Sequence, residues 1–272
     1  MGGWRPRKDQ NVDRRNGFQM RINLSGQTAV VTGATGQLGR VMALTLAECG
    51  ANIIIHYLQN EVKATELQQE IEAMARKSLV VQADVTNPKS VMDMQRAIFD
   101  RFGHADIVVA NAVSQYQWTT ILEQPLHDYQ SQFDMCVLQS VLLAKAFVPN
   151  MITRKGGRII GINTECAMQN DPTQSAYVAG KRGMDGIYRI LAKEIGPYNI
   201  TVNQVAPGWT ISARDRDNHT ERNEAYESHV PLRRRGTDQE VANAVAFLAS
   251  DLASFITGAV IPVSGGNVMP TI

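Results

Sequence analysis

Cysteine is scarce in this chain: only Cys49, Cys136 and Cys166 are present. Their number is odd and no Cys-x-x-Cys spacing occurs, which argues against a disulfide framework and a thiolate zinc site. This usage is typical of a reducing compartment, so we expect a cytoplasmic protein. The five histidines form neither His-x-x-x-His nor His-Glu-x-x-His, and we therefore expect no metal site.

Excess charge and long apolar runs are missing as well. The chain has 27 Lys and Arg against 26 Asp and Glu, a formal charge of +1, which provides no overall field for nucleic acid or an anionic membrane. No uncharged apolar run approaches the roughly 18 residues of a membrane span. The beginning of the chain also lacks the apolar core of a signal peptide. We expect a soluble protein with neither a nucleic-acid nor a membrane partner.

The first 19 residues contain five Lys and Arg, two Asp and no hydrophobic period. We interpret residues 1–20 as a disordered tail, which a start at Met20 would remove almost entirely. The functional alternative is a weak polyanion-binding arm.

From residue 27 onward, short β-branched runs alternate with helical patterns. Strands are predicted at 28–33, 52–57, 78–85, 106–111, 157–163, 200–207 and 259–265. Helices are predicted after the first strand and near 61–77, 88–102, 126–154, 174–195 and 238–250. Apolar strands alternating with helices predict a doubly wound α/β fold, with a seven-stranded parallel sheet and helices on both faces. No linker or repeat divides residues 21–272, so we expect a single domain.

One long stretch, residues 210–236, is polar, charged and without a clear period. A loop of this length inside a compact domain is usually a lid or disordered.

A glycine-rich turn joins the first strand to the first helix and reads Thr32-Gly33-Ala34-Thr35-Gly36-Gln37-Leu38-Gly39. Glycines let the backbone approach a pyrophosphate, and a helix N-terminus offers aligned N–H groups. Taken alone, the turn fits a tight connection without a ligand equally well. Its place after the first strand of an alternating pattern favours dinucleotide binding.

The end of the second strand bears on the choice of cofactor. It reads His56-Tyr57-Leu58-Gln59-Asn60 and has no carboxylate to bind the ribose 2′-OH of NAD, which favours NADP. The arginine expected to grip a 2′-phosphate is missing too, so His56, Gln59, Asn60 or Arg40 would have to serve. Further along, Asp84 suits either an adenine contact or a cap for the following helix.

Tyr177 and Lys181 are four residues apart and would share one face of a helix. A phenol with a pKa near 10 exchanges protons poorly at neutral pH unless a nearby ammonium stabilises its phenolate, and Lys181 would supply that charge. Thr164, thirteen residues upstream, would place a hydroxyl beside the phenol to orient a carbonyl. The alternative is an ordinary surface tyrosine and lysine.

From about Leu24 to Val268 the chain resembles the short-chain dehydrogenase/reductase family, in its single-domain branch. The motifs that carry the resemblance are the Thr-Gly start of the glycine turn, Asp84-Val85, Ala110-Asn111-Ala112, Tyr177 with Lys181, Asn203 with Pro207-Gly208, Pro-Leu-x-Arg-x-Gly at 231–236, and the C-terminal run from Phe-Leu-Ala-Ser-Asp to Gly266.

The resemblance implies a Rossmann-type domain that moves hydride between NAD(P)(H) and a carbonyl or alcohol. Tyr177 would be the acid/base, Lys181 would bind the nicotinamide ribose and lower the pKa of the tyrosine, and Thr164 would replace the usual serine. Residues 210–230 would form the substrate lid. The implied cofactor-binding set is Gly33, Thr35, Gly36, Gln37, Leu38, Gly39, His56, Asp84, Val85, Asn111, Tyr177, Lys181, Pro207, Gly208 and Thr210.

Four residues depart from the family pattern. Gln37 occupies the usual place of the middle glycine, and its Cβ could crowd the phosphates. Val113 replaces a glycine, Thr164 replaces a serine, and Cys136 replaces an asparagine that kinks a long helix and holds a proton-relay water. These departures motivate an alternative, a catalytically silent dinucleotide-binding sensor or partner subunit.

The motif order is most similar to 3-oxoacyl-[acyl-carrier-protein] reductases, whereas the charged lid also suits a sugar-type substrate. Glu165 either faces a cationic or polyhydroxy substrate or is a solvated charge at the end of a strand. Trp209 either lines the substrate pocket or is a buried aromatic residue. Gly180, Gly183 and Gly186 form a small-residue stripe that indicates close helix packing. In the family such helices pair between subunits, so we expect a homotetramer or homodimer.

Overall fold

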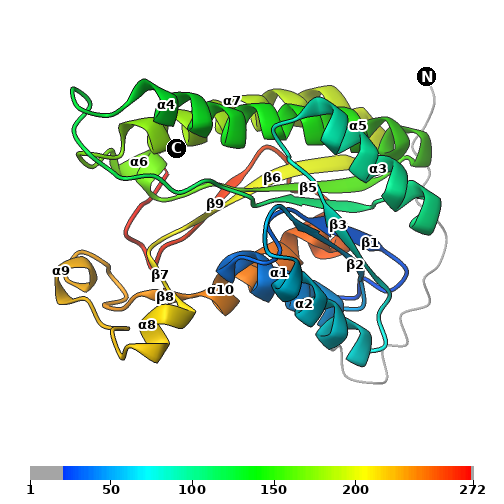
Figure 1. Ribbon diagram of the computed structural model, residues 1–272, viewed down its shortest axis with the longest axis horizontal. Helices are drawn as coiled ribbons and strands as arrows, with labels where there is room; N and C mark the ends of the chain where they lie inside the picture. Colours follow the sequence, from blue (N-terminus) through cyan, green and yellow to red (C-terminus); the bar gives the residue numbers. More distant parts are fainter. Residues whose placement is uncertain (1–20, 271–272) are drawn as a thin grey trace.

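The computed structural model describes residues 21–270 (Figure 1). The predicted tail at 1–20 lies outside the described residues. Seven parallel strands form the main sheet, in the order β3-β2-β1-β4-β5-β6-β9. They are β1 (Thr28–Val31), β2 (Asn52–Tyr57), β3 (Ser78–Gln82), β4 (Ile107–Ala110), β5 (Gly157–Ile162), β6 (Ile200–Pro207) and β9 (Val260–Val263).

Two layers of helices enclose the sheet (Figure 1). One face carries α1 (Gln37–Glu48), α2 (Glu61–Ala73) and α10 (Asp238–Ala249), and the other carries α3 (Pro88–Phe102), α4 (Leu126–Phe133), α5 (Gln139–Arg154) and α7 (Ser175–Ile195). Within these layers α1 packs against α10, and α4 packs against α7. The predicted doubly wound α/β fold is confirmed.

The strands are mostly apolar because the sheet is covered on both faces. Successive side chains of a strand point to opposite faces. Accordingly Val31 and Ile55 belong to one buried cluster, whereas Val30 and Ile54 belong to the other. The central position of β1, between β2 and β4, makes the chain cross over in opposite directions on either side of it. In such sheets ligands bind in the crevice at the carboxyl ends of the strands.

The single helix predicted near 126–154 has an interruption. Between α4 and α5 the residues Asp134–Leu138 form a π-helical turn, η1, which no apolar period predicts. By length and composition alone, Leu126–Arg154 could cross a membrane. In the structure this span packs against α3, α7, β4 and β5, which is the environment of a core helix.

The polar 210–236 segment contains more regular structure than the sequence indicated. It holds α8 (Ala213–Asp217) and α9 (Glu224–Glu227), and its two ends pair as short strands β7 (Thr210–Ile211) and β8 (Gly236–Thr237). Figure 1 shows α8 and α9 at one end of the molecule. A short helix, α6 (Cys166–Gln169), was also not predicted. The predicted strand at 78–85 and helix at 61–77 end earlier, at Gln82 and Ala73.

Candidate active site

The glycine-rich turn lines one end of a cleft of about 820 Å³ at the carboxyl ends of β1, β2 and β4. Only glycine fits at position 39, because a Cβ there would lie 2.2 Å from the Gly33 carbonyl oxygen. Helix α1 has Gly36 as its N-cap, and among residues 21–270 no side chain caps it. Its first N–H groups are therefore available to an anion, and a pyrophosphate fits this turn.

Gln37 does not fold back over the turn. Its Nε2 donates to the carbonyl oxygen of Ile211, 2.7 Å away in β7. The departure from glycine at this position thus connects the turn to the 210–236 segment, while Gln37 still lines the cleft.

His56 is hydrogen-bonded to the backbone of the glycine-rich turn. Its Nδ1 accepts a hydrogen bond from the backbone N–H of Gly33, and its Nε2 donates to the carbonyl oxygen of Ala83, both at 2.9 Å. Burial lowers the pKa of His56, so the ring is neutral at pH 7. Both ring nitrogens are engaged and the ring is uncharged, so His56 offers no cation to a 2′-phosphate.

Two other residues considered for the 2′-phosphate are engaged elsewhere. The Arg40 guanidinium is paired with the Glu70 carboxylate, and the Asn60 side chain caps α2 by accepting from the N–H of Lys63 at 3.0 Å. Gln59 lines the cleft and is exposed. The end of β2 therefore presents neither a carboxylate nor a free cation to a bound ribose, within the described part of the chain.

Asp84, Val85 and Asn111 line the same cleft. Asn87, rather than Asp84, caps α3, so the helix-cap alternative for Asp84 is wrong. The Asp84 Oδ1 instead accepts from the N–H and hydroxyl of Thr86, at 2.9 and 2.6 Å. Asn111 donates to the Thr32 carbonyl oxygen at 2.9 Å, which fixes β4 against the glycine turn.

Tyr177, Lys181 and Thr164 come together where β5 ends beside α7. The Lys181 Nζ lies 5.6 Å from the centroid of the Tyr177 ring and donates to the Ile162 carbonyl oxygen at 2.6 Å. Burial raises the pKa of Tyr177, and a hydrogen bond from Thr164 lowers it in part. Burial also lowers the pKa of Lys181. Lys181 and Thr164 are therefore buried beside Tyr177, which is half-buried and lines a cavity.

Cys136 lies in the π-helical turn η1 and is 1% exposed. Burial raises the pKa of its thiol, so it is uncharged beside Lys181. The hydroxyl of Ser140 donates to the Cys136 carbonyl oxygen at 2.6 Å. The helix therefore deforms at this position without an asparagine side chain.

The β6 end fixes the loop that contains Thr164. The Pro207 carbonyl oxygen accepts from the N–H of Glu165 at 2.9 Å, and the N–H of Gly208 donates to Val263 at 3.0 Å. A Cβ at Gly208 would lie 2.7 Å from the Tyr226 hydroxyl. Thr210, just beyond, lines the cofactor-sized cleft.

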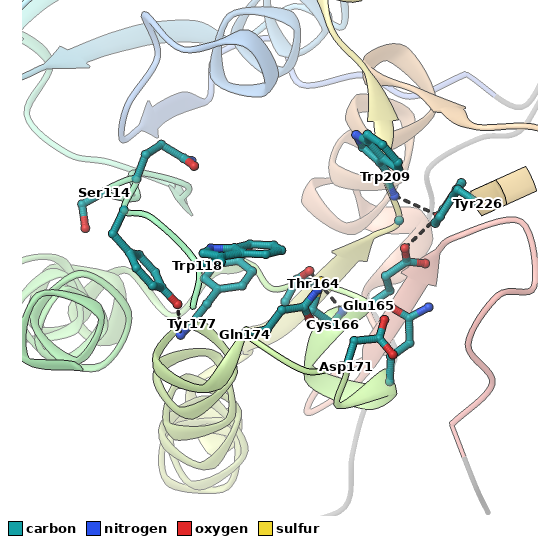
Figure 2. Close-up of a pocket in the computed structure, with 14 residues that line it drawn as sticks. Ser114, Trp118, Thr164, Glu165, Cys166, Asp171, Gln174, Tyr177, Trp209 and Tyr226 are labelled. Atoms are coloured by element: carbon teal, nitrogen blue, oxygen red, sulfur yellow. Dashed lines mark hydrogen bonds between the residues drawn. The ribbon is translucent and has the colours of Figure 1, made fainter. Parts of the chain in front are cut away.

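A second cavity of about 570 Å³ opens beside Tyr177 (Figure 2). Figure 2 shows Trp118 beside Tyr177 on one side and Trp209, Tyr226 and Glu165 on the other. Trp118 stacks on Tyr177 with ring centroids 6.0 Å apart. Residues 114 and 115 line this cavity and the larger cleft, so the two spaces adjoin next to the Tyr177 group.

Arg235 organises the 210–236 segment, and its side chain is 1% exposed. Its guanidinium donates to the carbonyl oxygens of Thr210 and Thr220, at 2.8 and 3.1 Å, and to the Asp215 carboxylate at 2.9 Å. These bonds hold the Asp215 pKa well below its usual range. The guanidinium also lies 4.5 Å from the centre of the Trp209 ring. The segment is thus anchored from within.

Glu165 is 3% exposed, which rules out the solvated-charge interpretation. Its Oε1 accepts from the Tyr226 hydroxyl at 2.7 Å, and its Oε2 accepts from the Asn267 amide at 3.1 Å. Sequence reasoning missed Tyr226, Asn267 and Arg235. Their partners lie far away in the chain, so no local spacing could have identified them, although a Tyr in a polar segment is a weak signal.

Comparisons with known proteins agree with this geometry. A family model described as "Enoyl-(Acyl carrier protein) reductase" matches residues 33–267. A 3-oxoacyl-[acyl-carrier-protein] reductase from Synechocystis sp. is 35% identical over 247 residues, which cover 90% of this chain and 98% of the relative. An L-rhamnose 1-dehydrogenase (NAD(P)(+)) from Sphingomonas sp. is 29% identical and covers 89% of this chain and 96% of the relative.

Among solved structures, a 7α-hydroxysteroid dehydrogenase complexed with NADH and 7-oxo glycochenodeoxycholic acid superposes with a TM-score of 0.83. It is 27% identical, and the match covers 92% of this chain and 97% of that one. The glycine turn, the switch point of the sheet and these matches lead to one conclusion. The chain belongs to the short-chain dehydrogenase/reductase family of NAD(P)-dependent oxidoreductases.

Proposed function

We propose that the protein interconverts a secondary alcohol and a ketone, with Tyr177 as the acid/base. The observation that carries the proposal is the group of Tyr177, Lys181 and Thr164 beside a cavity that shares Ser114 and Gln115 with the dinucleotide-sized cleft. One cavity has the size and glycine turn that a dinucleotide needs, and the other is open to a smaller molecule.

In the reducing direction, the Tyr177 hydroxyl protonates the carbonyl oxygen while the carbonyl carbon is reduced. The nicotinamide cofactor supplies the hydride. In the oxidising direction the Tyr177 phenolate takes the proton of the alcohol. The Lys181 ammonium, on the same face of α7, stabilises that phenolate. Thr164, which already bonds the phenol, orients the substrate oxygen.

The dinucleotide would occupy the larger cleft. Its pyrophosphate would contact the turn from Gly33 to Gly39, its adenosine would lie near Asp84, Val85 and Asn111, and its nicotinamide end would lie near Pro207, Gly208 and Thr210. No carboxylate stands at the end of β2 to repel a 2′-phosphate, which favours NADP(H). The absence of a free cation there keeps the preference small.

Residues 210–230 would act as the lid of the smaller cavity, since Tyr226 within them and Trp209 directly before them line that cavity. A 3-oxoacyl thioester and a sugar-type compound are the two substrate classes that motif order and lid composition suggest. The silent-sensor alternative relied on Gln37, Val113 and Cys136. The Gln37 amide is bonded to the Ile211 carbonyl oxygen, and Lys181 remains beside Tyr177 with Cys136 in the helix.

The test is Tyr177→Phe, with nicotinamide absorbance followed over a panel of ketones, oxoacyl thioesters and keto-sugars. We expect the wild type to turn over a substrate of the panel and the variant to have a kcat at least a thousandfold lower. Cofactor binding, measured by tryptophan fluorescence, should be the same in both proteins. Tyr198→Phe, at a tyrosine 42% exposed on the surface, is the control and should keep full activity. Retained turnover in Tyr177→Phe would refute the assignment.

We further propose that residues 21–272 act as a single domain that assembles as a homotetramer or homodimer in the cytoplasm. Gly180 and Gly183 are explained within the chain, where a Cβ would meet Gln132 and Val137 at 2.7 Å. Gly186 has nothing within 4 Å, and Ile190 on the same helix is 59% exposed. Light scattering of the purified chain tests the assembly, and a monomer would refute it.

A further inference from the structure

The cavity beside Tyr177 has an unusual charge pattern. Its lining includes two carboxylates, Glu165 and Asp171, and no lysine or arginine among the described residues. An anionic substrate entering this space would meet like charge without a compensating cation. The lining therefore disfavours acids, phosphates and other anions.

Glu165 lines the cavity and is buried. The hydroxyl of Tyr226 and the amide of Asn267 each donate to a different carboxylate oxygen, which fixes the orientation of the group. A carboxylate accepts about four hydrogen bonds in all, so these contacts leave capacity for another donor. The group is thus held ready to accept another donor.

Aromatic faces complete the cavity. Trp118, 43% exposed, stacks on the Tyr177 ring at an interplanar angle of 26°. Trp209, 48% exposed, stands on the side of Glu165 and Tyr226 (Figure 2). Flat aromatic walls bury the C–H faces of a ring, while the carboxylate satisfies polar groups on its edge.

We propose that the substrate is an uncharged hydroxylated ring, the chemistry of a sugar or cyclitol, and that Glu165 accepts a hydrogen bond from one of its hydroxyls. Glu165 lines the same cavity as Thr164 and Tyr177, so its carboxylate would contact the ring whose reacting oxygen lies at those two residues. Glu165 is thereby a specificity-determining residue. The inference rests on the proposed alcohol–ketone chemistry and selects between its two substrate classes.

The first experiment compares three kinds of alcohol with NAD(P)⁺: aldohexoses and inositols, the matched uronic acids, and cyclohexanol. We expect the hydroxylated rings to exceed both the uronates and cyclohexanol by at least about tenfold in kcat/KM. Uronates as good as their parent sugars, or hydroxylated rings no better than cyclohexanol, would overturn the inference. Turnover of cyclohexanol that Tyr177→Phe abolishes would at the same time uphold the proposed function.

The second experiment uses Glu165→Gln, which keeps shape and removes charge. This variant should lower kcat/KM for the hydroxylated ring about tenfold and change kcat/KM for cyclohexanol by less than about twofold. It should also reduce the preference for the parent sugars over the uronates. Glu224→Gln, at an exposed glutamate on α9, is the matched control and should change none of these values. Equal losses on all substrates would show a structural role only and overturn the inference.

If Glu165→Gln does not fold, Tyr226→Phe removes one of the two donors that orient the carboxylate. We expect that variant to lower kcat/KM for the hydroxylated ring relative to cyclohexanol as well, by a smaller factor than Glu165→Gln. A Tyr226→Phe enzyme with unchanged selectivity between sugar and cyclohexanol would overturn the inference.

Discussion

The guanidinium of Arg235 lies 4.5 Å from the centre of the Trp209 ring, although the two residues flank the proposed lid on opposite sides in the sequence. This contact and the bonds of Arg235 to Thr210, Thr220 and Asp215 close the segment on itself. A buried arginine thus takes the place of an apolar core for a stretch that has few apolar residues.

Arg235→Met should loosen the lid. We expect a loss of about 2–4 kcal/mol in the stability of this segment, because Asp215 and two carbonyls lose their donor. The KM for substrate should rise more than the dissociation constant for cofactor. Limited proteolysis with mapping of cleavage sites in 210–236 measures the first effect. Arg234→Met, which removes an exposed pair with Glu240, should cost less than about 1 kcal/mol.

Gly39→Ala should abolish dinucleotide binding. The added Cβ would lie 2.2 Å from the Gly33 carbonyl oxygen, so the turn would have to move. Gly196→Ala is the control just after α7, where nothing lies within 4 Å and φ is −52°, and should stabilise the chain by up to about 1 kcal/mol. Fluorescence titration with NADPH and thermal unfolding of both variants check this. Tight NADPH binding by Gly39→Ala would contradict the assigned phosphate site.

His56 should make stability depend on pH. Its pKa is lowered in the folded chain from 6.5, so between the two pKa values the unfolded chain binds more protons. The contribution of the neutral ring is therefore complete above pH 6.5 and is lost as the pH falls through the lower, folded-state pKa. Urea unfolding at several pH values between 5 and 8 measures the slope. His56→Asn should flatten the curve, whereas His127→Gln, at a side chain 80% exposed, should not.

Gln59→Glu should reverse the cofactor preference. The wild type should prefer NADPH to NADH by less than about tenfold, since the β2 end has neither a carboxylate nor a free cation for the 2′ position. A carboxylate at residue 59 would repel the 2′-phosphate and weaken the binding of NADPH, while the affinity for NADH would be nearly unchanged. Dissociation constants for both cofactors at two salt concentrations test this, because the repulsion should decrease at high salt.

Sequence patterns predicted the parts of the molecule that depend on local periodicity. The bounds of β2, α3 and β6 agree with the predicted 52–57, 88–102 and 200–207, because continuous apolar or amphipathic runs define them. The turn at Gly33–Gly39 and the meeting of Tyr177 with Lys181 also followed from spacing. Thr164 was proposed from its place at the end of the predicted strand 157–163, and the family resemblance matched it to the usual serine.

Features that depend on distant contacts could not be predicted. The π-helical turn at Asp134–Leu138 changes hydrogen bonding without changing the apolar pattern. The anchoring of 210–236 depends on a buried arginine, whereas hydrophobic periodicity detects only buried apolar groups. The Glu165–Tyr226 bond joins residues 61 positions apart. Sequence reasoning identified Glu165 and could not say which way its carboxylate turned.

The hydrogen bond from Gln37 to the Ile211 carbonyl oxygen has a kinetic consequence. This bond joins the glycine turn to strand β7 at the start of the lid, across 174 positions of sequence. A dinucleotide bound at the turn would therefore also stabilise β7 and the lid that follows it. That connection favours a compulsory order of arrival, dinucleotide first and alcohol second. Product-inhibition patterns would then show the oxidised and reduced dinucleotides competing for the free enzyme alone.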